Sequence, residues 1–164
     1  MIRVPIANEQ TTLPIDEPRL QQAVRAVFEE ASVVEAEVSV AVVDDPAMET
    51  LNRRYLDHDG PTDVLSFVLE QSEDRLEGQI VVSADTAQTA AARFGWPAED
   101  ELLLYVIHGA LHLVGCDDDT VEEQAEMRRR ERACLARFGL TPRWDELEAA
   151  EEAPRPMSEG EPHS

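Results

Sequence analysis

The chain has 164 residues, a formal net charge of −21 and no lysine. A chain of this length can bury a sizeable core, and we expect one domain over residues 1–147 followed by a disordered acidic tail over residues 148–164. The sequence has no run of eighteen apolar residues and no charged-then-apolar leader. This excludes a predicted membrane span and favours a cytoplasmic location. The two cysteines are expected to be free thiols.

The first half of the chain predicts alternating strands and helices. A short apolar segment at residues 2–6 predicts an edge strand, because Pro5 cannot donate to a central hydrogen-bond ladder. Asp16, followed by Pro18, predicts the start of a helix with apolar residues at helical spacing. Further predicted elements are a strand at 38–43, a helix from 45 to about 55, a polar loop at 57–63, and strands at 64–69 and 79–83. The last two strands are expected to be antiparallel neighbours because the loop between them is short.

The second half of the chain predicts three helices. Ser83 caps an alanine-rich helix that ends at Gly95. Residues 100–113 are apolar nearly all round and predict a buried central helix. Thr120, with a glutamate three residues later, is typical of a capping box that opens a charged helix ending before Gly139. The order βαβαββααα therefore predicts an α+β domain, with a small mixed four-stranded sheet covered by helices.

Two histidines, His108 and His112, lie four residues apart in the predicted central helix. This spacing places both imidazoles on one face, one turn apart. Gly115 follows at the place where a left-handed cap can end the helix and turn the chain back. Of the three aspartates that come next, Asp118 is the predicted third ligand. Two nitrogens and one carboxylate oxygen, with a position left open, are what a catalytic zinc site requires.

Other interpretations of this segment remain open. The two histidines could be packed core residues, although buried neutral imidazoles need partners that the helix itself does not supply. Asp117 or Asp119 could be the third ligand or could cap the next helix, and Cys116 could be a soft ligand. His58 in the polar loop is a candidate fourth ligand or proton donor, but the interpretation as a surface histidine is favoured. A zinc peptidase is disfavoured, because Gly109 occupies the position at which the HExxH motif has its general base.

The sequence around the histidines, HGALHLVG followed by aspartates, resembles the signature of the YbeY family of bacterial metal-dependent endoribonucleases. Two further segments resemble the motifs of this family in the same order: LNRRY followed by PTDVLSF within residues 51–67, and GQIVVS at 78–83. The resemblance extends over roughly residues 20–140. It implies the same α+β arrangement, with the metal in a cleft at the central helix.

The resemblance also implies a function. The expected activity is that of a zinc-dependent endoribonuclease, with one Zn²⁺ ion, that cleaves single-stranded RNA. Its expected role is in 3′-end maturation of small-subunit ribosomal RNA and in ribosome quality control. The implied partners are ribosomal RNA and the small ribosomal subunit with its proteins, and neither DNA nor a membrane is expected to be one.

Three positions depart from the family pattern. Asp118 stands where the family usually has a third histidine ligand, and Gln79 stands where its GDIVIS motif has an aspartate. Leu56 stands where the family has an arginine associated with catalysis. Arg53, three residues earlier on a similar helical face, is the candidate that could make the phosphate contact instead, or could be a solvent-exposed helix arginine. The alternative function is a ribosome-assembly or RNA-binding factor with a structural metal and weak or no catalysis.

The charge pattern bears on how RNA would be recognised. Residues 128–132 hold the one basic run, and Glu126 lies at ion-pairing distance along a helix from Arg130. This favours a solvated, salt-bridged face over a phosphate-binding patch. Residues 145–164 account for −6 of the net charge of −21. Because long-range attraction to RNA should be poor, we expect specificity to come from a folded RNA or a ribosomal-protein partner.

Overall fold

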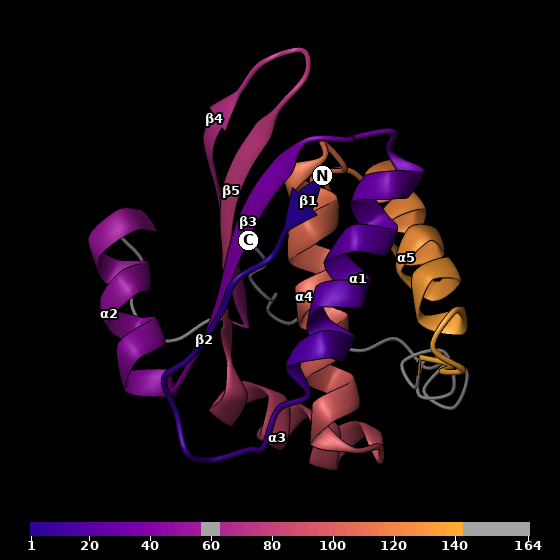
Figure 1. Cartoon of the computed structure of the whole chain (residues 1–164). Helices are drawn as coiled ribbons and strands as arrows, with labels where there is room; N and C mark the ends of the chain where they lie inside the picture. The colour runs from indigo at the N-terminus through magenta and orange to yellow at the C-terminus, as the bar shows by residue number, and fades with distance from the viewer. Residues whose placement is uncertain (57–62, 143–164) are drawn as a thin grey trace.

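The computed structural model describes residues 1–56 and 63–142 and shows an α+β architecture, as predicted (Figure 1). The elements in chain order are β1 (Ile2–Arg3), β2 (Ile6–Asn8), α1 (Glu17–Glu30), β3 (Ala36–Val43), α2 (Asp45–Leu56), β4 (Val64–Gln71), β5 (Leu76–Ser83), α3 (Ala84–Phe94), α4 (Ala98–Leu113) and α5 (Val121–Ala136). Residues 57–62 of the predicted polar loop, with His58, and the predicted acidic tail at 148–164 lie outside the described residues.

The sheet is mixed, with strand order β1–β3–β5–β4 and with β2 also paired to β3. β1, β2 and β5 each run parallel to β3, while β4 runs antiparallel to β5 as predicted. The described part of the sheet contains five strands instead of the predicted four, because the N-terminal segment forms two short strands along one edge of β3. Pro5 lies between these strands and has no N–H to donate, although its carbonyl accepts a hydrogen bond from the Val40 amide at 2.9 Å.

The two faces of the sheet are covered by different helices (Figure 1). Alternate residues of β3 point to opposite sides. Val40 and Val42 are fully buried in the main core, which lies between the sheet and helices α1, α3 and α4. Val43 belongs to a smaller cluster on the other face, where Met48 of α2 is fully buried. The sheet thus separates α2 from α4.

Helix α4 is the central element of the main core, as its apolar sequence predicted. Four consecutive residues point in different directions around the helix, and all of them are buried: Leu102, Leu103, Leu104 and Tyr105. The helix begins at Ala98, two residues before the predicted start, because Pro97 occupies its N-cap in an extended conformation.

Gly109 allows α4 to lie directly against the sheet. A Cβ atom at this position would lie 2.8 Å from Ile80 Cγ2 and 3.1 Å from Val64 Cγ2. The Ser66 hydroxyl of β4 also donates a hydrogen bond to the Gly109 carbonyl at 3.2 Å. The absence of a side chain at one helical position therefore fixes how closely the neighbouring histidines approach β4 and β5.

Three predicted helix starts are confirmed by their caps. The side chains of Asp16, Ser83 and Thr120 each accept a hydrogen bond from the backbone amide three residues later. Within residues 1–56 and 63–142, no helix combines the length and the apolar character needed to cross a bilayer.

Candidate metal centre

The end of α4 turns the chain back as the position of Gly115 predicted. Gly115 has a φ of +98°, a left-handed conformation that favours glycine. Its amide donates to the His112 carbonyl at 3.0 Å, and the Cys116 amide donates to the Leu111 carbonyl at 2.9 Å. These two bonds form a Schellman motif, which satisfies the last helical carbonyls and reverses the chain direction.

The turn that follows is held by the start of α5. The Gln124 side-chain amide donates to the Asp118 carbonyl at 3.1 Å. One oxygen of Glu123 accepts from the backbone amides of Asp119 and Thr120, at 3.0 and 3.1 Å, and so completes the predicted capping box. The backbone on both sides of Asp118 is thus fixed by local hydrogen bonds.

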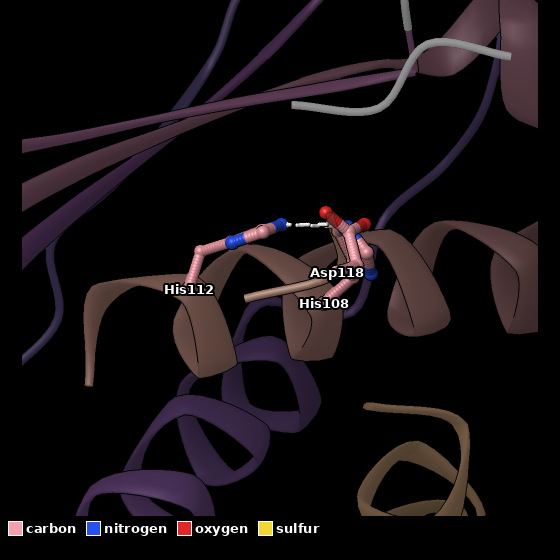
Figure 2. A group of neighbouring side chains, drawn as sticks. All are labelled: His108, His112 and Asp118. Atoms are coloured by element: carbon pink, nitrogen blue, oxygen red, sulfur yellow. Dashed lines mark hydrogen bonds and ion pairs between the residues drawn. The ribbon is translucent and has the colours of Figure 1, made fainter. Parts of the chain in front are cut away.

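His108, His112 and Asp118 come together at this turn, and we call them the triad (Figure 2). The Nε2 atoms of the two histidines are 3.1 Å apart. Asp118 Oδ2 lies 3.6 Å from His108 Nε2 and 3.7 Å from His112 Nε2. Each triad side chain is mostly buried, with 14%, 14% and 17% of its surface exposed.

The triad has dimensions that suit a small divalent cation. Tetrahedral zinc binds nitrogen and oxygen at about 2.0–2.2 Å, which places neighbouring ligand atoms about 3.3–3.5 Å apart. The three separations in the triad lie on both sides of that range. Of the three consecutive aspartates, Asp118 belongs to the triad. Asp117 and Asp119 have exposed side chains and are not part of it.

A buried carboxylate lies behind the triad. Glu131 of α5 is 2.6 Å from His108 Nδ1 through its Oε2 atom. Burial alone would lower the pKa of His108, but the hydrogen bond to Glu131 and the charges of Glu131, Asp63 and Asp118 outweigh it and raise the pKa. Burial and the neighbouring His108 lower the pKa of His112. The pKa values of the two imidazoles are therefore shifted in opposite directions.

Asp63 and Glu101 are two further acids whose pKa is raised. Burial raises the pKa of Asp63 to about 6, although the charge of His108 and a backbone hydrogen bond from Val64 act in the opposite direction. Burial also raises the pKa of Glu101, whose carboxylate accepts a 2.7 Å hydrogen bond from the Trp96 indole. The charges of Asp63, Asp118 and Glu131 all act on His108, so an excess of negative charge faces the triad, which favours binding of a cation.

Sequence reasoning missed Glu131. A signal was present, because Met127, Glu131 and Leu135 recur at four-residue spacing on the buried face of α5. A carboxylate on an otherwise apolar helix face calls for a partner. The sequence did not identify that partner as His108, because the contact depends on how α5 packs against α4.

The other predicted residues lie away from the triad. Arg53 is on α2, which packs on the opposite face of the sheet from α4, and its guanidinium pairs with Glu49 at 2.8 Å. Leu56 is the last residue of α2, and its side chain lies outside the described part of the structure. Cys116 and Cys134 are free thiols, as expected, and neither belongs to the triad.

The arginine run forms the salt-bridged surface that the sequence predicted. The Glu126 carboxylate accepts from Arg129 at 2.6 and 3.0 Å and from Arg130 at 2.7 Å. These hydrogen bonds hold the pKa of Glu126 at about 2.

The packing around Gly109 disfavours a zinc peptidase of the HExxH type. A glutamate at this position would need a Cβ atom 2.8 Å from Ile80 Cγ2, and Ile80 is fully buried. The residue after the first histidine of the triad therefore faces the sheet and cannot carry a general base.

Together, the fold and the triad define an α+β protein with a candidate metal centre of the kind that metal-dependent hydrolases use. The model of the family described as "Endoribonuclease YbeY" matches residues 5–139. The chain therefore belongs to the YbeY endoribonuclease family, and the resemblance noted in its motifs is confirmed.

Individual relatives agree with this assignment. The protein named Endoribonuclease YbeY from Moorella thermoacetica is 40% identical over 150 residues, which cover 82% of this chain and 96% of that protein. Its namesake from Sulfurovum sp. is 40% identical over 139 residues, covering 81% and 89%. The solution structure of TM1509 from Thermotoga maritima has a similar fold, with a TM-score of 0.51 and 24% identity over 97% of this chain and 100% of that one.

Proposed function

We propose that this protein is a metal-dependent endoribonuclease that hydrolyses phosphodiester bonds in RNA. The observation that carries this proposal is the triad, in which two imidazole nitrogens and one carboxylate oxygen lie 3.1–3.7 Å apart in a chain of an endoribonuclease family. Relatives about 40% identical to the chain are themselves named endoribonucleases.

The proposed cofactor is one zinc ion. His108 and His112 would bind it through Nε2 and Asp118 through Oδ2. Two neutral imidazoles and one carboxylate leave a net charge of +1 on such a site, compared with +2 for three histidines. A zinc ion bound there would supply an acidified water and an electrophile for a phosphoryl oxygen.

The residues of the chain have separate proposed tasks. The triad would bind the ion. Arg53 is the candidate cation for a phosphate contact, although its helix lies on the opposite face of the sheet from α4. Because Gly109 offers no general base, any base comes from another residue or from the phosphate itself. Leu56, at the family's arginine position, has no charge with which to stabilise a transition state.

The proposed substrate is single-stranded RNA at the 3′ end of small-subunit ribosomal RNA, cleaved during maturation and quality control in the cytoplasm. The net charge of −21 supports a substrate that is selected by its fold or by a bound ribosomal protein. Attraction of arbitrary RNA to a strongly acidic surface is weak.

A cleavage assay with purified full-length protein tests this function. We expect cleavage of single-stranded RNA, no cleavage of DNA of the same sequence, loss of activity after chelation, and recovery when zinc is added. A His112→Ala variant prepared in parallel controls for contaminating nucleases. Cleavage that survives chelation or persists in that variant contradicts the proposal.

The second candidate function is a ribosome-assembly or RNA-binding factor with a structural metal. It is favoured by the leucine at position 56 and by the ion pair between Arg53 and Glu49. This function predicts zinc binding and small-subunit association without turnover of RNA, so the same assay separates the two.

A further inference from the structure

Glu131 is a buried carboxylate in a surface helix that is otherwise strongly charged on its outer face. Its side chain is 7% exposed and lies beside Met127 and Leu135 on the inner face of α5. Burial of a carboxylate is costly unless hydrogen bonds compensate for lost hydration. An apolar residue would pack here without that cost, so the carboxylate calls for a specific explanation.

The surroundings of Glu131 make the cost larger. Asp63 and Asp118 are near enough to act on the charge of His108, and Glu131 itself raises the pKa of Asp63. Like charges repel across a buried site. The compensating contact is the 2.6 Å hydrogen bond between Glu131 Oε2 and His108 Nδ1, a length typical of a charge-assisted bond.

This hydrogen bond determines which ring nitrogen of His108 carries the proton. A carboxylate only accepts, so Nδ1 must donate, and the lone pair of the neutral ring then lies on Nε2. Nε2 is the atom that lies 3.1 Å from His112 Nε2 and 3.6 Å from Asp118 Oδ2. Among residues 1–56 and 63–142, a carboxylate supports the ring of His108 in this way and no residue accepts a hydrogen bond from His112 Nδ1.

We propose that Glu131 is a positioning residue of the metal centre, which fixes His108 with its proton on Nδ1 and its Nε2 lone pair directed at the ion. Carboxylates that hold a ligating histidine in this way strengthen metal binding by about 10- to 100-fold. The inference rests on the proposed metal centre. It also links α5 to that centre, because this helix supplies the support for a ligand carried by α4.

The test compares three variants of the full-length protein. Glu131→Ala removes the acceptor, and Glu131→Gln keeps a neutral acceptor of similar shape. Glu101→Gln is the matched control, since it neutralises another buried glutamate, seven residues before His108, that bonds to Trp96 instead. Zinc affinity is measured by competition with a chromophoric chelator, and thermal melting of each apo protein verifies that it folds.

We expect zinc affinity to fall about 10- to 100-fold in Glu131→Ala, to fall less in Glu131→Gln, and to stay within about twofold of the wild type in Glu101→Gln. Nitrogen-15 NMR of the histidines provides a readout that a purely structural role would not change. We expect His108 in the wild type to be protonated on Nδ1, with the proton slow to exchange, and this protection to be lost in Glu131→Ala.

Several outcomes would overturn the inference. Wild-type zinc affinity in a folded Glu131→Ala protein contradicts it, as does an equal loss in Glu101→Gln or a His108 proton on Nε2. If Glu131→Ala does not fold, Glu131→Gln decides, and an unchanged affinity and unchanged His108 proton exchange in that variant count against the inference. Absence of zinc binding by the wild type would instead refute the metal centre itself.

Discussion

Replacement of Gly109 by alanine tests whether α4 lies too close to the sheet to accept a side chain at this position. The new Cβ atom would lie 2.8 Å from Ile80 Cγ2 and 3.1 Å from Val64 Cγ2. Both neighbours are β-branched and at most 1% exposed, so neither can swing away. Because these neighbours cannot move, overpacking here should cost about 2–3 kcal/mol, the upper part of the usual range. Alanine recovers about 1 kcal/mol through its greater helix propensity.

The expected net effect of Gly109→Ala is a loss of about 1–2 kcal/mol in the free energy of unfolding. For a chain of this size this lowers the melting temperature by about 2–4 °C per kcal/mol. Urea denaturation measures this loss in the free energy of unfolding, provided that the m-value is unchanged. In an Ile80→Ala background, which removes the closest atom, the same substitution should cost about 1 kcal/mol less. Equal or greater stability of Gly109→Ala, or an equal cost in both backgrounds, would refute the reasoning.

A zinc titration tests the third ligand. We expect Asp118→Ala to weaken zinc binding and Asp117→Ala to leave it unchanged. Asp118→His should retain or strengthen zinc binding, because imidazole is a competent ligand. Equal losses in Asp117→Ala and Asp118→Ala would contradict the triad. If Arg53 contacts phosphate, Arg53→Ala slows RNA cleavage about 100-fold and a second change, Leu56→Arg, restores it. No change of rate in either variant counts against that role. Removal of residues 148–164 leaves the melting temperature nearly unchanged, because few apolar side chains are lost, and raises RNA affinity, most at low salt. A large fall in melting temperature would show that these residues stabilise the domain.

Features set by neighbouring residues were predictable from the sequence. The caps at Ser83 and Thr120 and the left-handed turn at Gly115 depend on hydrogen bonds within a few positions. The pairing of His108 with His112 follows from helical spacing alone. Asp118 was also predictable from the local sequence, because the turn before it and the capping box after it each depend on residues a few positions away.

Features that depend on packing between distant segments were harder to predict. The N-terminal segment forms two strands because β3 is long enough to pair with both, at Ala36 and again at Val40. The contact of Glu131 with His108 requires the placement of α5 against α4. In the same way, Arg53 was chosen for a phosphate contact because it lies three residues before Leu56, yet the sheet separates its helix α2 from α4.

The most direct test of the metal centre is the zinc content of the purified chain by elemental analysis. We expect about one zinc ion per chain in the wild type, as a three-ligand site with one open position provides. The His108→Ala, His112→Ala double variant should hold essentially none. Full zinc content in that double variant, with its fold intact, would contradict the centre described here.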